Sequence, residues 1–208
     1  MDFPNPSIPI STCAASDCAG CSVTGSIHCH FGPADLFHFY LICLPSFLVG
    51  GAAVLATGLW PLLIWIGIVV GFFGFVEIRV MCSHCPHYAE EASTLRCWAN
   101  YGSPKLWKYR PGPMSNAENI VFFFGLALVW GYPLWFFVVG GLWFLLVVYA
   151  LVTTSFFITL RTFLCSQCMN FACPLNRVPN SVRELFWERN PVVGRAWEAR
   201  SQLRTLEK

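Results

Sequence analysis

Two long stretches of this chain contain no Asp, Glu, Lys or Arg, and they constrain the fold more than any other feature. They span residues 36–76 and 119–160. Each is about twice as long as the ~20 residues with which a helix crosses the hydrocarbon layer of a bilayer. Each is interrupted near its middle by glycine or proline, at 57–61 and 139–141. Because backbone polar groups in lipid must be satisfied within the segment, each stretch is predicted to form a helical hairpin.

The predicted fold class is therefore an all-α membrane protein with four transmembrane helices, arranged as two hairpins. The helices are expected near residues 36–57, 60–80, 119–138 and 141–160. The composition agrees, because 56% of the residues are hydrophobic and only 12% are charged, outside the range of soluble domains. The chain then divides into a cysteine-rich N-terminal arm (1–35), a first hairpin (36–80), a cysteine loop (81–118), a second hairpin (119–160), and a cysteine motif with a short helical tail (161–208).

The cationic residues predict the orientation. All thirteen Lys and Arg lie at or beyond the outer ends of the hairpins, and none lies at a hairpin tip. By the positive-inside rule, the arm, the middle loop and the tail face the cytoplasm. We therefore expect a multi-pass protein of the inner (cytoplasmic) membrane with both termini in the cytoplasm. Aromatic residues near the two tips are expected to form a belt at the far interface: Trp60, Trp65, Tyr132, Trp135 and Trp143.

Three C-x-x-C pairs, each followed by a third cysteine, carry the chemistry of the loops. They are Cys18, Cys21 and Cys29; Cys82, Cys85 and Cys97; and Cys165, Cys168 and Cys173. A C-x-x-C turn directs two thiolates at one metal, as in zinc sites and iron–sulfur proteins, and cytoplasmic thiols stay reduced. The nine residues are therefore predicted metal ligands, and Cys43, inside the first hairpin, is better explained as a small buried hydrophobe. Further candidate ligands are Cys13, His28, His30, His84 and His87.

The two hairpins resemble copies of one unit. Arg79 and Arg161 end the hairpins shortly before the second and third C-x-x-C pairs. The third cysteine of each half begins a C-x-x-N sequence, at residues 97–100 and 173–176. We expect an internal duplication whose pseudo-twofold axis runs along the membrane normal. Such symmetry would bring both cysteine groups to the cytoplasmic end of one bundle.

The third cysteine group lacks a fourth ligand of its own. No histidine lies near residues 165–173, whereas the first two groups have neighbouring histidines. Three alternatives remain: a ligand from another segment, an exogenous group, or pooling of the cysteine groups. Two pooled sites of four thiolates each would also connect the N-terminal arm to the bundle.

The Cys-Pro steps favour an iron–sulfur cluster as the bound group. Cys85-Pro86 and Cys173-Pro174 match the way bacterial ferredoxin motifs end. The first hypothesis is an iron–sulfur electron-transfer subunit that links a quinone or cytoplasmic donor to a partner redox enzyme. It would be at most an electron-transfer subunit of an oxidoreductase complex. The alternatives are a non-catalytic scaffold or assembly factor with structural zinc, and a protein whose C-x-x-C pairs cycle as dithiols.

The expected partners follow from these hypotheses. They are the lipid bilayer, a redox protein or complex, and a quinone as a candidate small molecule, whereas no feature indicates nucleic-acid binding. Glu77 and Arg79 are expected to form an ion pair at the membrane edge. The alternative role of Glu77 is proton binding beside a quinone.

Overall fold

The computed structural model describes residues 7–206, and within the last helix it describes the side chains up to residue 200 and that of Gln202. The first six residues of the predicted N-terminal arm lie outside this range. So do the last two residues of the tail, including Lys208, one of the cations that predict the orientation.

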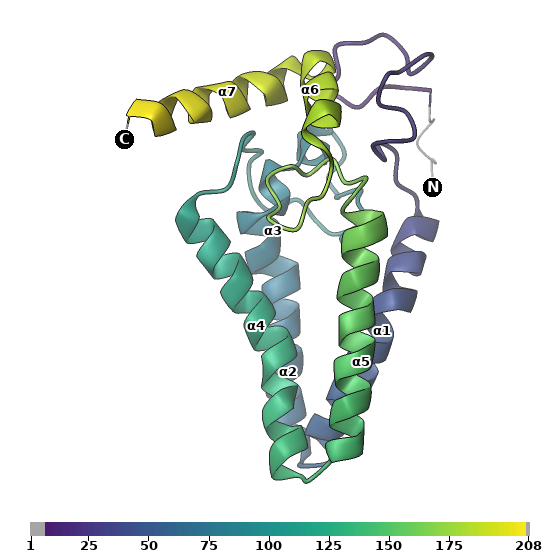
Figure 1. Cartoon of the computed structure of the whole chain (residues 1–208), viewed down its shortest axis with the longest axis vertical. Helices are drawn as coiled ribbons and strands as arrows, with labels where there is room; N and C mark the ends of the chain where they lie inside the picture. The colour runs from purple at the N-terminus through teal and green to yellow at the C-terminus, as the bar shows by residue number, and fades with distance from the viewer. Residues whose placement is uncertain (1–6, 207–208) are drawn as a thin grey trace.

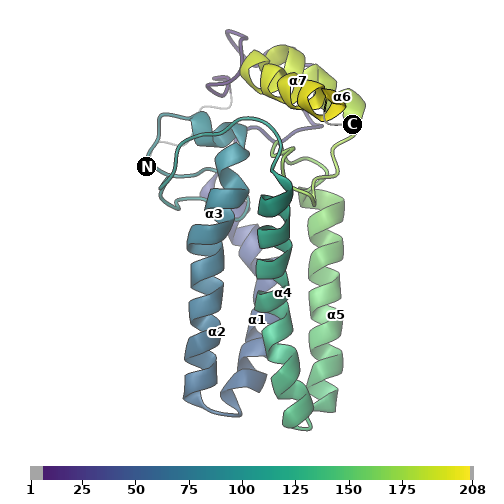
Figure 2. The same ribbon diagram turned by 90° about the vertical axis from the view of Figure 1, so that its left-hand side faces the viewer.

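Four long helices form a bundle (Figures 1 and 2). They are α1 (Pro33–Leu55), α2 (Leu59–Gly71) with its continuation, α4 (Asn116–Val139) and α5 (Trp143–Thr159). α2 runs on through a π-helical turn, η1 (Phe72–Val76), into α3 (Glu77–Val80), and α5 runs into a second π turn, η4 (Leu160–Leu164). All four spans are long and apolar enough to cross a membrane, and residues 7–206 contain no β-strand. The prediction of an all-helical membrane protein with four crossings is confirmed.

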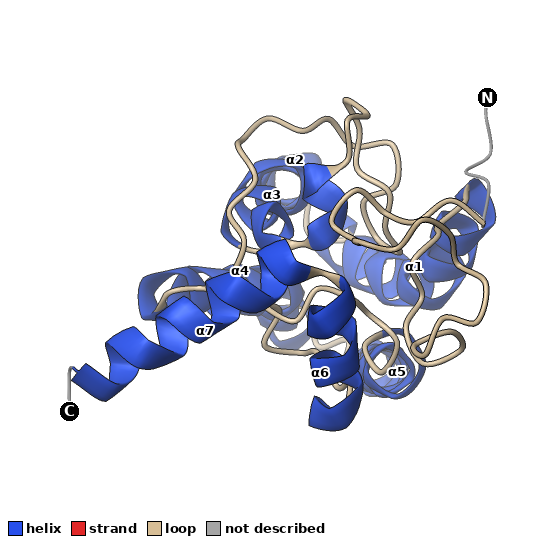
Figure 3. Ribbon diagram, turned by 90° about the horizontal axis from the view of Figure 1, so that it is seen from above, coloured by secondary structure: helices blue, strands red, loops and turns tan. Residues whose placement is uncertain are grey.

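The connections at the two ends of the bundle differ in length. At one end, turns of three residues join α1 to α2 and α4 to α5. At the other end lie the long loops, which contain the short 3₁₀ helices η2 (Cys82–His84) and η3 (Pro86–Ala89). Two further helices, α6 (Asn180–Arg189) and α7 (Pro191–Leu206), lie across this loop end (Figure 3). α7 begins at Pro191 because proline fits the first turn of a helix but not its interior.

Small residues allow the helices to approach closely. α1 contacts α4 and α5 as well as α2, and α4 contacts both α2 and α5. A Cβ added at Gly125 of α4 would overlap the ring of Phe72. One added at Gly50 of α1 would lie 3.0 Å from the ring of Tyr149 and 3.3 Å from Pro133. Glycine at these contacts is typical of helix packing in membranes.

A tryptophan satisfies a backbone carbonyl that a proline leaves unpaired. Pro133 lies inside α4 and has no N–H, so the carbonyl of Val129 loses its helical donor. The indole N–H of Trp65 donates to that carbonyl at 2.8 Å, and Trp65 is only 4% exposed. The assignment of Trp65 to the interfacial belt is therefore wrong. Trp65 is buried because α2 packs against α4 at this position. Trp60, at the start of α2, is by contrast 78% exposed.

Trp65→Phe is expected to lower the free energy of unfolding by about 1–3 kcal/mol, because it leaves a buried carbonyl unpaired. Thermal unfolding in detergent, followed by circular dichroism, measures the change. Trp60→Phe is the matched control, because it makes the same replacement at an exposed position. Equal shifts for the two variants would show that the hydrogen bond to Val129 contributes nothing.

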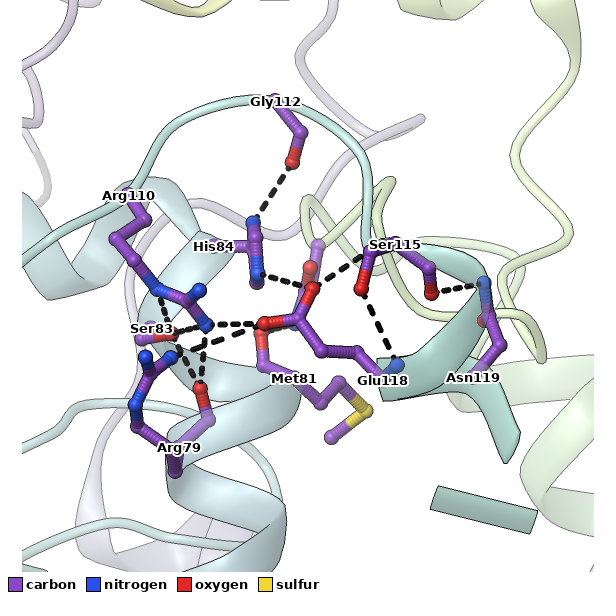
Figure 4. A network of polar contacts seen from close by, with 10 residues as sticks. Arg79, Met81, Ser83, His84, Arg110, Gly112, Ser115, Glu118 and Asn119 are labelled. Carbon is purple, nitrogen blue, oxygen red and sulfur yellow. Dashed lines mark hydrogen bonds and ion pairs between the residues drawn. The ribbon is translucent and has the colours of Figure 1, made fainter. Parts of the chain in front are cut away.

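Glu118, in the first turn of α4, ties the loop end of the bundle together (Figure 4). Its side chain accepts a hydrogen bond from the Ser115 backbone N–H at 2.8 Å, and Ser115 Oγ accepts one from the Glu118 N–H at 3.2 Å. This reciprocal arrangement is a capping box. Glu118 Oε1 lies 2.7 Å from Arg110 Nη2 and 3.7 Å from Arg79 Nη1. The expected ion pair of Arg79 with Glu77 is thus wrong, because Glu118 from the other hairpin takes this partner.

His84 belongs to the same network. Its Nε2 lies 3.5 Å from Glu118 Oε2, and its Nδ1 lies 3.0 Å from the carbonyl oxygen of Gly112 (Figure 4). The network therefore joins the end of the second crossing, the middle loop and the start of the third crossing. The network holds in place the backbone segments from which the cysteine loops extend.

Candidate metal centre

The structure brings the cysteines of the second and third groups together. All six line one cavity of about 570 Å³ at the loop end of the bundle. We call them the membrane-end thiols: Cys82, Cys85, Cys97, Cys165, Cys168 and Cys173. Three of them follow each hairpin in the sequence, and all eleven cysteines of the chain are free thiols.

The loops that carry these thiols are held by backbone hydrogen bonds. The loop around Cys97 folds back on itself, with the Leu95 N–H donating to Ser103 O at 2.8 Å. In the other half, Cys165 directly follows the π turn η4 and donates its N–H to Leu160 O at 2.8 Å. The Arg177 N–H then donates to Cys165 O at 2.9 Å, which closes the third cysteine loop. The thiols are thus positioned by ordered backbone.

Four of the membrane-end thiols share one local arrangement. The backbone N–H group of the residue two positions later in the chain lowers the pKa of each thiol. These pairs are Cys85 with His87, Cys97 with Ala99, Cys168 with Asn170, and Cys173 with Leu175. Cys97 Sγ accepts a hydrogen bond from the Asn100 N–H at 3.2 Å. Backbone donors of this kind stabilise thiolates and tune iron–sulfur clusters.

Burial makes these thiols poor acids in the absence of a cation. Burial raises the pKa of Cys97 to about 12 and that of Cys168 to about 12, and the N–H donors offset this only in part. Burial and the neighbouring thiols raise the pKa values of Cys85 and Cys173 well above the usual range. At neutral pH the metal-free thiols are therefore protonated, and a bound cation must displace the protons.

Loading the metal-free protein with Zn²⁺ is expected to release one proton for each thiol that binds. The thiols are protonated below their raised pKa values, so metal and protons compete. The affinity should fall as the pH falls and rise with pH throughout the neutral range. Calorimetric titration in buffers of different ionisation enthalpy counts the protons. Zinc uptake at the membrane-end thiols without proton release would contradict the protonation states given above.

Two asparagines of the C-x-x-N sequences organise the site. Asn100 Nδ2 donates to Glu77 Oε2 at 2.9 Å and to Cys82 Sγ at 3.4 Å. Asn176 Nδ2 donates to the carbonyls of Cys168 at 2.6 Å and Asn170 at 3.1 Å. The sequence reasoning took the repeated C-x-x-N only as a sign of duplication and missed this role. The repeated C-x-x-N sequence is the feature from which the role of the two asparagines could have been predicted.

The cysteines of the arm form a separate group, the N-terminal thiols. Cys13, Cys18, Cys21 and Cys29, together with His30, line a cavity of about 30 Å³. Cys18 Sγ lies 3.8 Å from His30 Nε2. Burial and the other three thiols raise the pKa of Cys29 to about 12. The arm therefore gathers its own thiols without those of the bundle.

Helix α6 forms one wall of the N-terminal thiol cavity. The Ala14 N–H donates to Arg189 O at 2.8 Å, and Thr12 Oγ1 donates to Asn190 Oδ1 at 2.8 Å. Arg189 and Asn190 both line the cavity. The first cysteine group is thus completed by the tail of the chain.

Aromatic rings contact two of the candidate histidines, His28 and His87. The His28 ring stacks on Trp98, with ring centres 4.8 Å apart, and the His87 ring meets Phe31 at 5.1 Å. The His28 N–H donates to Gln167 O at 2.9 Å, next to Cys168. Of the four predicted histidines, only His30 and His87 line a thiol cavity, whereas His28 and His84 are held in other contacts.

The candidate ligands are distributed around the cavity. Within residues 7–206, no three His, Cys, Asp or Glu side chains converge as the ligands of a single metal ion do. The membrane-end thiols lie apart among the other residues that line the cavity. Comparison with protein-family models, curated proteins and solved structures finds no match to this chain.

Proposed function

We propose that this chain is an integral membrane iron–sulfur protein that carries electrons between a quinone or cytoplasmic donor and a partner redox enzyme. The observation that carries this proposal is the set of six buried or half-buried thiols around one cavity at the end of the membrane bundle. The proposed ligands are the four thiols with matching N–H donors: Cys85, Cys97, Cys168 and Cys173. Two of them follow each hairpin in the sequence, with Cys82 and Cys165 flanking them.

The surroundings of these thiols suit an iron–sulfur cluster. When bound, such a cluster accepts and donates one electron at a time. The backbone N–H groups lower the energy of added negative charge, whereas burial raises it, and the balance sets the potential. Asn100 and Asn176 hold the thiol loops in both halves, so little rearrangement would accompany a change of charge.

We also propose that the loop end faces the cytoplasm and that the two hairpins are duplicated copies. The distribution of charge supports the orientation, because the hairpin tips carry no Lys or Arg. The matched positions of the C-x-x-C and C-x-x-N sequences, with one π turn shortly before each pair, support the duplication. The membrane is then the inner (cytoplasmic) membrane, with both arms on its cytoplasmic side.

A second candidate role concerns the N-terminal thiols. Four cysteines and His30 line their small cavity and are ligand types that zinc takes, although the side chains as placed do not converge on one point. Zinc bound at the N-terminal thiols would hold the N-terminal arm against α6. If zinc also occupied the membrane-end thiols, the protein would be a non-catalytic scaffold or assembly factor.

Metal analysis of anaerobically purified protein tests the proposal. We expect a brown protein with iron and acid-labile sulfide in equal amounts, visible absorbance that dithionite bleaches, and one zinc per chain. A colourless protein that contains only zinc would overturn the electron-transfer role and favour the scaffold. A metal-free protein with a titratable disulfide would instead favour the dithiol relay.

A further inference from the structure

The cavity of the membrane-end thiols continues into the bundle as an aromatic-walled space. Residues of all four crossings line it, among them Phe47 of α1, Phe73 of η1, Trp130 of α4 and Phe156 of α5. The Trp130 ring stacks on Phe156 with centres 5.7 Å apart and lies 5.5 Å from the Phe47 ring. The membrane-end thiols lie at the loop end, whereas the lining between the helices is mainly apolar and includes Cys43 of α1. The walls of this space are flat rings at membrane depth.

Polar groups are concentrated at the end of this space that adjoins the thiols. Glu77 lines the cavity and is 4% exposed, and its Oε2 accepts the hydrogen bond from Asn100. Trp98 Nε1 and Asn170 Oδ1 also belong to the lining, are buried, and have no hydrogen-bond partner in the described part of the chain. The ring nitrogens of His87 make no well-formed hydrogen bond either, although the backbone of Cys29 lies near one of them.

Such groups indicate a ligand with polar atoms of its own. A buried donor or acceptor without a partner costs about 1–3 kcal/mol, which a bound ligand recovers. An apolar cavity of this volume with a few convergent polar groups is the usual form of a small-molecule site. A carboxylate accepts hydroxyl protons, and the Trp98 indole donates to a carbonyl oxygen. The pattern fits a flat ring that carries oxygen atoms.

We propose that this cavity binds a quinone or its quinol, with the ring at the Glu77 end and the tail between the helices. A phospholipid fits less well, because its phosphate would face a buried carboxylate and its acyl chain would leave the Trp98 and Asn170 polar atoms unpaired. The inference deepens the proposed function and rests on it, since a quinone is useful here only beside a centre that exchanges electrons. Glu77, for which the sequence favoured an ion pair, recognises the ligand's hydroxyl.

Gly74 provides a way to fill the cavity without disturbing the fold. It lines the cavity, and a Cβ added there meets nothing within 4 Å. Gly71, three residues earlier in the same crossing, is equally free of neighbours but lies outside the lining. Gly74→Leu is therefore the test variant and Gly71→Leu its matched control. Val70→Phe, at a 56% exposed lining residue, is a second filling variant if Gly74→Leu does not fold.

The experiment measures binding of decylubiquinone and its quinol to the full chain in phospholipid nanodiscs, by quenching of tryptophan fluorescence. We expect Gly74→Leu to weaken binding at least about tenfold and Gly71→Leu to leave it unchanged. Glu77→Gln should weaken the quinol several-fold more than the quinone, because it replaces the carboxylate that accepts the hydroxyl proton. Decanol, which has the chain but not the ring, should not compete.

Three results would overturn the inference: unchanged binding in both filling variants, no effect of Glu77→Gln on the quinol, or equal competition by decanol. Iron and sulfide are measured on the same samples. Iron-loaded protein that binds no quinone would remove this inference and leave the proposed function standing. Quinone binding to protein without iron would overturn the proposed function, and the assignment of the cavity as a quinone site would stand.

Discussion

Cys168→Ser is expected to abolish the visible absorbance of the purified protein and most of its iron. Cys168 is half-buried, the Asn170 N–H group lowers the pKa of its thiol, and it interacts electrostatically with thiols of both halves, Cys85 and Cys97 among them. Serine removes one soft thiolate from the four proposed ligands. Iron and sulfide analysis of anaerobic samples, with the visible spectrum, measures the loss.

Two further variants define which thiols are involved. Cys43→Ser is the control, because Cys43 lies inside α1 and belongs to no C-x-x-C pair. Cys165→Ser is expected to retain the iron, since Cys165 lacks the N–H arrangement of the other four. Loss of iron in Cys165→Ser as complete as in Cys168→Ser would show that the set of four is wrong. Full iron in Cys168→Ser would contradict the membrane-end site altogether.

Glu118→Ala is expected to destabilise the loop end of the bundle by about 2–3 kcal/mol. The change removes the capping box of α4 and leaves Arg110 without the carboxylate oxygen that lies 2.7 Å away. His84 and Arg79 lose the same partner. Because the network joins the middle loop to α4, we expect faster proteolysis of that loop and lower thermal stability in detergent.

Glu184→Ala is the matched control, because Glu184 is an exposed glutamate of α6 outside the network. Its midpoint of unfolding should stay within error of the unmodified chain. If Glu118→Ala and Glu184→Ala have the same midpoint of unfolding, the network does not contribute to the stability of the protein.

The crossings were predictable because lipid leaves few choices. A charge-free stretch twice the length of a span, with a break near its middle, has only the hairpin available. The predicted helix at 119–138 and the observed α4 (Asn116–Val139) differ by a few residues at most. The role of Trp65 was not predictable in this way. Its hydrogen bond depends on which face of α2 meets Pro133 of α4, and no local pattern encodes that.

The residue types of the site were predictable, and so was the meeting of the second and third cysteine groups at one end of the bundle. The C-x-x-C pairs identified the thiols, and the missing histidine near Cys165 left three sources for a fourth ligand: another segment, an exogenous group, or pooling of the cysteine groups. The partner of Glu77 depended on the fold of the middle loop, which brings Asn100 to it over 23 positions. Local spacing favoured Arg79 as the partner of Glu77, because the two residues lie only two positions apart. The sequence does not show that Glu118, far along the chain, pairs with Arg79.

The contact between Ala14 and Arg189 has a consequence for how the protein is made. The N-terminal thiols leave the ribosome first, yet a wall of their cavity belongs to α6, which is synthesised near the end. Cys85 and Cys97 likewise share their cavity with Cys168 and Cys173, which are synthesised after the second hairpin. Neither group of contacts can form on a nascent chain before these later segments have been synthesised.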